Sequence, residues 1–189
     1  MDSKIRHYYQ PALALADAPI SSTCVTSPYG SSDMTNGNEG QNASELLQLL
    51  HSGQILMVNQ RRRNGLIIFK RFHAEFAGPG AAVGGFYDRD CEGAIPVGNL
   101  SLVTPESHEE RQKAYLIRRQ WIRLMKQITE KPSPQQRVLK ILEQFEQYFD
   151  SETVARIPDE AFGLLVGVLP DTVRTVRKAS ANLERRGRF

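Results

Sequence analysis

The sequence predicts an α+β protein, and three observations indicate this. Runs of β-type residues occupy positions 54–104, a helical pattern starts at Ser107, and the C-terminal stretch FGLLVGVLPDTVRTVRKASANLERRGRF sets a glycine and a proline ahead of a basic helix. With 189 residues and 40% hydrophobic content, the chain can bury a core in one domain or two small ones. The expected units are a flexible arm over 1–42, a small β-rich domain over 43–105, a long helix over 106–131 and a helical domain over 132–189.

The charge is unevenly distributed along the chain. Residues 1–110 hold 8 Lys and Arg against 12 Asp and Glu, a net of −4, whereas residues 111–189 hold 16 against 9, a net of +7. A basic surface gains affinity for phosphate by releasing counterions, so the C-terminal half is expected to face a polyanion. A solvated helical surface is the alternative.

Composition argues against several classes of protein. No apolar stretch approaches the roughly 20 residues that cross a bilayer, and the N-terminus lacks the apolar core of a signal peptide, so a cytoplasmic protein without a membrane partner is expected. Cys24 and Cys91 have neither CxxC spacing nor neighbouring histidines, which predicts reduced thiols and no metal site. The histidines stand apart from any nucleophile or paired carboxylate, so neither an enzyme nor a cofactor is expected.

The first 42 residues are rich in Ser, Gly, Asn and Asp, which predicts the flexible arm. A short helix follows over 42–53, with Ser44 as N-cap and Gly53 at its end. Two β-type runs surround Asn64-Gly65, a dipeptide that favours a hairpin turn. The segment AGPGAAVGGFYDRDCEG is expected to be a surface turn, because it lacks the spacing of a phosphate-binding loop, and AIPVGNLSLV is expected to be one more strand.

A long helix begins at Ser107, which forms a capping box with Glu110. Its apolar residues repeat at intervals of four and three, the spacing of a helix that packs along a second helix, so a homodimer is expected. A core helix packed on its own sheet is the alternative. The chain then restarts with Ser133 as N-cap, Pro134 at the first helical position and Gln136 in a second capping box. The expected dimer-interface residues are Ala114, Ile117, Trp121, Leu124 and Ile128.

The C-terminal stretch has the pattern of a helix-turn-helix. Such a motif needs a small residue where its helices cross and a glycine in the turn, and Gly163 and Gly167 stand four apart in those roles. Pro170 suits the first position of the second helix. At 100° per residue the second helix turns Val173, Val176, Ser180 and Leu183 inward, and it leaves Asp171, Arg174, Thr175, Lys178 and Asn182 outward.

The segments SPQQRVLKILEQF and IPDEAFGLLVGVLPDTVRTVRKASANLERRG resemble the DNA-binding domain of the cyclic-AMP receptor protein and fumarate-nitrate regulator family. In that family a dimer helix leads into a helix-turn-helix, and the start of the recognition helix touches base edges. The resemblance implies that Pro170, Asp171 and Thr175 stand at base-reading positions, although a basic residue is common at the first and an arginine at the third. Residues 54–104 lack the family's phosphate-binding arginine after a Gly-Glu pair, so no cyclic nucleotide is expected to bind.

The expected function is that of a DNA-binding transcriptional regulator, which binds the major groove as a homodimer and has RNA polymerase as a further candidate partner. The alternative is a protein-interaction adaptor whose helix-turn-helix docks on polymerase or another regulator. The residues expected at double-stranded DNA are Asp171, Arg174, Thr175, Arg177, Lys178, Asn182, Arg185, Arg186 and Arg188.

Overall fold

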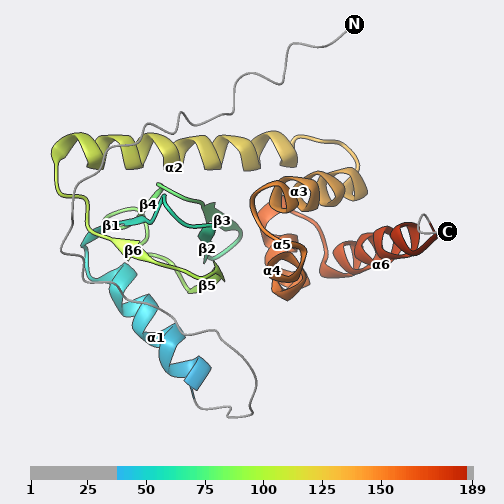
Figure 1. Cartoon of the computed structure of the whole chain (residues 1–189), viewed down its shortest axis with the longest axis horizontal. Helices are drawn as coiled ribbons and strands as arrows, with labels where there is room; N and C mark the ends of the chain where they lie inside the picture. The colour runs from blue at the N-terminus through green and yellow to red at the C-terminus, as the bar shows by residue number, and fades with distance from the viewer. Residues whose placement is uncertain (1–37, 187–189) are drawn as a thin grey trace, which may run out of the picture.

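The computed structural model describes residues 38–186 and combines helices with two small antiparallel sheets, as expected of an α+β chain (Figure 1). The arm expected over 1–42 lies outside the described residues except for its last five, which belong to the first helix. The elements in chain order are α1 Asn38–His51, β1 Ile55–Val58, β2 Asn64–Phe69, β3 Ala74–Ala77, β4 Ala82–Gly84, β5 Gly93–Gly98, β6 Leu102–Val103, α2 His108–Thr129, α3 Pro134–Tyr148, α4 Ser151–Arg156, α5 Asp159–Val166 and α6 Pro170–Arg186.

The first helix is longer than expected, because α1 starts at Asn38 and runs through Ser44. The prediction of Ser44 as N-cap was therefore wrong. The residues before it are polar and lack an apolar period, so the pattern gave no sign that the helix reaches back to Asn38. Gly53 follows the helix with φ of 81°, a left-handed conformation that glycine adopts without a steric cost.

The strands form two three-stranded sheets in the orders β4-β1-β6 and β3-β2-β5. The hairpin expected around Asn64-Gly65 is absent, because β1 and β2 belong to different sheets and this dipeptide is the start of β2. Glycine is needed at position 65 for a different reason: a Cβ there would lie 2.5 Å from Cζ of Phe76 on the neighbouring strand. Gly65 thus allows the Phe76 ring to pack closely against the backbone of β2.

The glycine-rich segment was expected to be a surface turn, and its first half is buried instead. Residues 80–85 are buried and contain strand β4, while Gly80, Gly84 and Gly85 have positive φ. At Gly78 a Cβ would lie 2.3 Å from the indole ring of Trp121, so helix α2 packs directly on this backbone. The segment AIPVGNLSLV likewise divides into two strands, β5 and β6, which join different sheets.

Helix α2 lies along the sheets and reaches the C-terminal helices, whereas α1 and α6 lie at opposite ends of the molecule (Figure 1). The N-cap of α2 is Ser107, as expected, and its hydroxyl accepts from the Glu110 amide at 3.1 Å. The reciprocal half of the expected capping box is not formed, because the Glu110 carboxylate accepts from the Glu106 amide at 2.8 Å instead. The second capping box was predicted wrongly. Ser133 is the N-cap of α3 and Pro134 its first residue, but the Ser133 hydroxyl donates to the Gln135 side chain and caps no amide.

The face of α2 with the four-and-three spacing packs inside the chain. Trp121 is buried, with its ring 4.9 Å from that of Phe76 in β3 and 5.1 Å from that of Tyr148 in α3. Ala114 and Ile128 are also buried, while Ile117 and Leu124 are partly buried against the same core. These residues therefore fit the alternative interpretation, a core helix packed on its own sheet. A dimer would need another surface.

One continuous apolar core joins the sheets to the C-terminal helices. The Phe76 ring lies 4.7 Å from that of Phe145 in α3, which in turn lies 5.1 Å from that of Phe162 in α5. Aromatic pairs at such separations add stability beyond the area they bury. The helix-turn-helix is thus packed against the β-rich part through contiguous rings.

A buried ionic cluster fixes α2 to both sheets. Arg118 donates to Glu75 at 2.6 Å and to Asp88 at 3.3 Å, and Lys70 lies 3.4 Å from Asp88 and also pairs with Asp90. Burial raises the pKa of Glu75, but the charge of Arg118 and its hydrogen bond outweigh burial and hold that pKa below its usual value. Each of these charges has a partner, so the cluster is structural.

Candidate nucleic-acid interface

The geometry of the helix-turn-helix agrees with the sequence pattern at its turn. Gly167 ends α5 with φ of 65° and ψ of 50°, and its amide donates to the Gly163 carbonyl. A Cβ at Gly163 would lie 2.8 Å from the Val168 carbonyl oxygen, so only glycine lets the turn close on α5. Pro170 is the first residue of α6, and Val173 and Val176 are buried beneath it. The turn was therefore predicted correctly from local chemistry.

The outward face of α6 is exposed at each expected position whose side chain the structure describes. Asp171, Arg174, Thr175 and Lys178 are all exposed. Asn182, Arg185 and Arg186 belong to α6, but their side chains lie outside the described part, and Arg188 lies outside the described residues altogether. Among the side chains that the structure describes, the polar face available to a DNA groove consists of Asp171, Arg174, Thr175 and Lys178.

Three of these four side chains, those of Asp171, Arg174 and Thr175, are already engaged. Arg174 donates to Asp171 at 2.7 Å, and its Nε lies 3.6 Å from a carboxylate oxygen of Asp159, while half of the side chain remains exposed. The Thr175 hydroxyl donates to the Asp171 carbonyl. Lys178 has no ion pair among the described residues. Arg174 would exchange one exposed carboxylate for a phosphate or a base edge, whereas Lys178 is available as it stands.

Arg177 was expected to neutralise a phosphate, and its surroundings give it a structural role instead. Its guanidinium donates to Asp159 at 2.9 Å and to the Val154 and Ile157 carbonyls at 3.0 Å each. It also lies 4.9 Å from the centre of the Phe162 ring. These carbonyls belong to the C-terminal end of α4, which a cation stabilises. Because the donors are used inside the fold, Arg177 ties α6 to α4 and α5.

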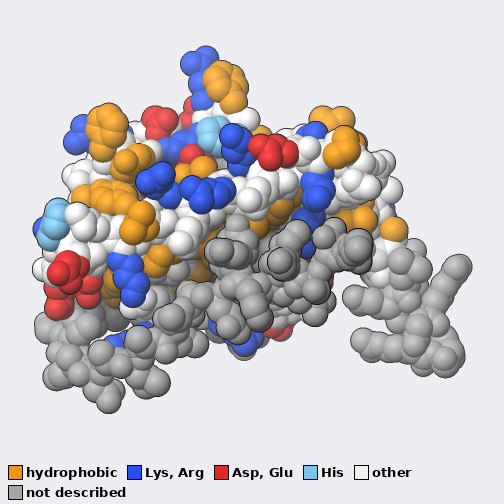
Figure 2. Space-filling model, turned by 90° about the horizontal axis from the view of Figure 1, so that it is seen from above, with side chains coloured by type: hydrophobic (Ala, Val, Ile, Leu, Met, Phe, Trp, Pro, Cys, Tyr) orange, Lys and Arg blue, Asp and Glu red, His pale blue; other side chains and the backbone are white. Residues whose placement is uncertain are grey.

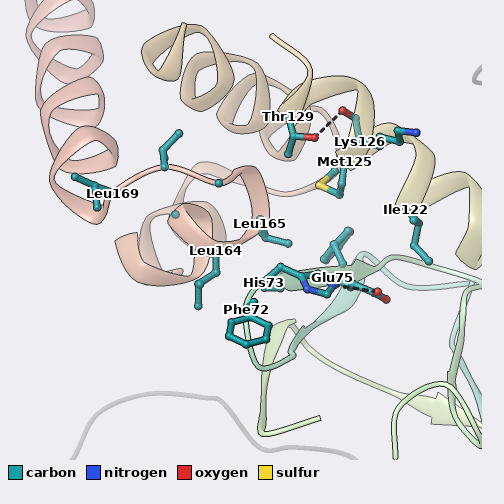
Figure 3. Close-up of a pocket in the computed structure, with 15 residues that line it drawn as sticks. Phe72, His73, Glu75, Ile122, Met125, Lys126, Thr129, Leu164, Leu165 and Leu169 are labelled. Carbon is teal, nitrogen blue, oxygen red and sulfur yellow. Dashed lines mark hydrogen bonds and ion pairs between the residues drawn. The ribbon is translucent and has the colours of Figure 1, made fainter. Parts of the chain in front are cut away.

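A groove beside the motif was not predicted from the sequence. Its volume is about 530 Å³, and it lies between the loop joining β2 to β3, the C-terminal half of α2, and α5 with its following turn (Figure 3). Leu164 and Leu169 form the wall on the helix-turn-helix, and Phe72 forms the opposite wall. Exposed apolar residues have no period of their own in a sequence, so no pattern marked them in advance.

Metal-ligating and nucleophilic side chains were expected to form no site. Within 38–186, no cluster of three or more His, Cys, Asp or Glu has the arrangement of a metal site. Cys91 lies 3.3 Å from the His51 ring, but burial and the negative charge of Asp88 raise the pKa of its thiol, so it stays protonated at neutral pH. None of the helices in this part of the chain is long and apolar enough to cross a membrane.

Comparison with known proteins gave no match: no protein-family model, no curated protein and no solved structure matches this chain. The resemblance to the cyclic-AMP receptor protein and fumarate-nitrate regulator family therefore stays a prediction.

Proposed function

We propose that the chain is a DNA-binding transcriptional regulator that places α6 in the major groove. The observation that carries the proposal is the exposed polar face of α6, with Arg174 and Lys178 one turn apart, on a helix positioned by the left-handed Gly167 and the buried Val173 and Val176. A recognition helix needs such a free face and such a support. Lys178 would contact phosphate, and Asp171, Arg174 and Thr175 would meet base edges.

A homodimer would bring two such helices to two half-sites. The five residues with the four-and-three spacing are packed inside the chain, so the proposed dimer uses another surface. Sedimentation of the full chain across micromolar concentrations tests this part separately, and a monomer at all concentrations would remove the two-half-site arrangement.

The DNA proposal is tested by a mobility shift with genomic fragments across a salt series. Arg174→Ala should cost about 1–3 kcal/mol of binding free energy and relax specificity at one base, because a bidentate contact to a base edge has that value. Lys178→Ala should weaken all sequences alike and lower the salt slope by about one. Lys113→Ala is the matched control, because it removes the same charge from an exposed position on the N-terminal half of α2, at the far end from α6 (Figure 1).

The interaction adaptor is the second candidate, and one observation favours it. Leu169 stands directly before α6 and is 73% exposed, at a place where a polar cap would suit a DNA phosphate. If Arg174→Ala and Lys178→Ala leave the mobility shift unchanged while both variants stay folded, DNA binding through α6 is refuted and the adaptor remains.

A further inference from the structure

The groove beside the helix-turn-helix concentrates exposed apolar surface. Eight large hydrophobic residues are exposed among those that the structure describes, and four of them line this one groove. Exposed apolar residues are ordinary when scattered, but a contiguous set marks a binding surface. The four are Phe72 at 81% exposure, Leu169 at 73%, and Ile122 and Leu164 at 40% each.

The groove has a firm floor and walls from three parts of the fold. Phe76, Met125 and Leu165 line it and are buried in the core. Figure 3 shows Leu164 and Leu165 of α5 on one side and Phe72 and His73 on the other, with Met125 from α2 beside them. A volume of about 530 Å³ between such walls can hold the apolar face of a short helix, which recognition grooves read through anchors at i, i+3 or i+4, and i+7.

A basic stripe on α2 reaches this groove at Lys126, which is one of its lining residues. Arg119, Arg123 and Lys126 are exposed and recur at intervals of four and three, so they share one side of α2, and Ile122 is next to that side. None of the three has an ion pair among the described residues. Lys and Arg side chains gather over this face of the molecule in Figure 2. The positive charge of the stripe favours an acidic ligand, whereas the apolar floor of the groove has no preference for charge.

We propose that the groove docks an amphipathic helix from a partner protein, with Leu or Phe anchors on one side and Glu or Asp beside them. The anchors would fill the space between Phe72 and Leu169, and the carboxylates would face the stripe of Arg119, Arg123 and Lys126. The inference deepens the adaptor proposed above, and it holds whether or not α6 binds DNA, because the groove residues and the outward residues of α6 are different side chains on adjacent surfaces.

The charge also argues against two occupants from the chain itself. The apolar stretch nearest the N-terminus, YYQPALALA, follows Arg6 and His7, and residues 3–16 contain no carboxylate. It would bring further positive charge to the stripe. Two copies paired groove to groove would set two basic stripes side by side, which like charges oppose.

The test uses synthetic helical peptides and the full chain. A fluorescein-labelled 15-residue peptide with Leu at helical i, i+4, i+7 and i+11 and Glu at the flanking positions should bind with a dissociation constant of about 10–100 μM by fluorescence anisotropy. The same peptide with Lys in place of Glu should bind at least about tenfold more weakly, because its charge repeats that of the stripe. Equal affinity for the two peptides, or no saturation at about 1 mM, would overturn the proposal.

Matched variants locate the binding. Phe72→Ser and Leu169→Ser should each weaken the Glu peptide about tenfold or more, whereas Phe86→Ser and Leu139→Ser, which change exposed residues outside the groove, should leave it unchanged. Because all four positions are exposed, circular dichroism should show native folds. Reversing the stripe with Arg119→Glu, Arg123→Glu and Lys126→Glu together should transfer the preference to the Lys peptide. If neither the groove variants Phe72→Ser and Leu169→Ser nor the charge reversal changes peptide affinity, the groove is refuted as the binding site.

Two further measurements separate this proposal from its rivals. A peptide of residues 1–20 should compete poorly with the Glu peptide, and stronger competition would make the N-terminal segment the occupant. Sedimentation should be unaffected by Leu169→Ser, and loss of a dimer would make a second copy the occupant. Phe72→Ser should leave the mobility shift on DNA unchanged, so failure of peptide binding and failure of DNA binding are distinguishable.

Discussion

Replacing Arg177 by Ala tests whether this residue holds the helix-turn-helix together or contacts a phosphate. The guanidinium makes three hydrogen bonds, to Asp159, Val154 and Ile157, and its side chain is 23% exposed. Hydrogen bonds to a charged group contribute roughly 1.5–3 kcal/mol each when isolated, and the contact with the Phe162 ring adds about 0.5–1 kcal/mol. These bonds share one side chain, so they do not add in full, and partial exposure lowers the total.

The expected loss from Arg177→Ala is therefore about 3 kcal/mol in the free energy of unfolding. In a chain of this length that corresponds to a fall in Tm of about 6–12 °C. Urea denaturation followed by circular dichroism measures the loss directly. The stability of Arg177→Lys should lie between that of wild type and that of Arg177→Ala. An ammonium keeps the ion pair with Asp159, but it lacks the planar fork that reaches both carbonyls.

Arg174→Ala is the matched control, because it stands three residues earlier on the same helix and approaches the same Asp159. Half of its side chain is exposed and its nearest partner is an i,i+3 carboxylate, so its loss should cost less than about 1 kcal/mol of stability. A loss below about 1 kcal/mol for Arg177→Ala would refute the structural role. So would a loss of DNA affinity by Arg177→Ala at unchanged stability.

Three further predictions concern the turn, the core and the ionic cluster. Gly167→Ala should destabilise the fold by about 1 kcal/mol and Gly167→Val by about 2–3 kcal/mol in urea denaturation, because φ is positive although a Cβ would have space, while Gly163→Ala should destabilise by a clash at normal φ. Trp121→Ala should cost about 3–5 kcal/mol and unfold part of the sample, because its ring is buried in the core, whereas Leu116→Ala on the exposed side of α2 should stay within about 0.5 kcal/mol. The pKa of Glu75 in the folded protein lies below its ordinary value of 4.5, so its contribution to stability is complete above pH 4.5 and is lost as the pH falls through the lower folded value. The difference in urea midpoint between wild type and Glu75→Gln should therefore shrink below pH 4.5 and stay constant from pH 5 to 7.

The turn of the helix-turn-helix was predictable because its determinants are local. Gly167 needs a left-handed backbone, Gly163 needs the absence of a Cβ, and Pro170 supplies a helical φ in advance. Each requirement is met within eight residues and depends little on the rest of the fold. The same holds for Ser107, whose hydroxyl caps an amide only three residues away.

The sheet and the long helix were harder to predict because their partners are distant in sequence. The Asn64-Gly65 dipeptide suits a turn, but its glycine instead admits the ring of Phe76, which the sequence does not place beside it. The spacing of apolar residues in α2 indicates correctly which face of the helix is covered, but it does not identify the element that covers it. Trp121 meets Phe76 and Tyr148 of the same chain where a second helix was expected.

The candidate site shows the same division between local and distant information. Helical periodicity sets Arg174 and Lys178 outward, and the structure agrees. Arg177 was expected at DNA beside them, but only the fold reveals that the end of α4 brings two carbonyls, and α5 brings Asp159, to its guanidinium. The sequence does not distinguish an arginine that contacts a polyanion from an arginine that binds the carbonyls at a helix end. The folded backbone distinguishes them, because it places those carbonyls beside the guanidinium.

Leu169 joins the two surfaces proposed here, because it precedes α6 directly and also forms a wall of the groove. A helix docked between Phe72 and Leu169 would therefore lie next to any DNA that α6 contacts, and its carboxylates would approach the phosphates. Since the aromatic core from Phe76 to Phe162 packs the motif on the sheet, the motif cannot swing away to relieve that repulsion without breaking buried contacts. DNA and an acidic partner should compete at low salt, and the competition should weaken as salt screens the two sets of negative charge.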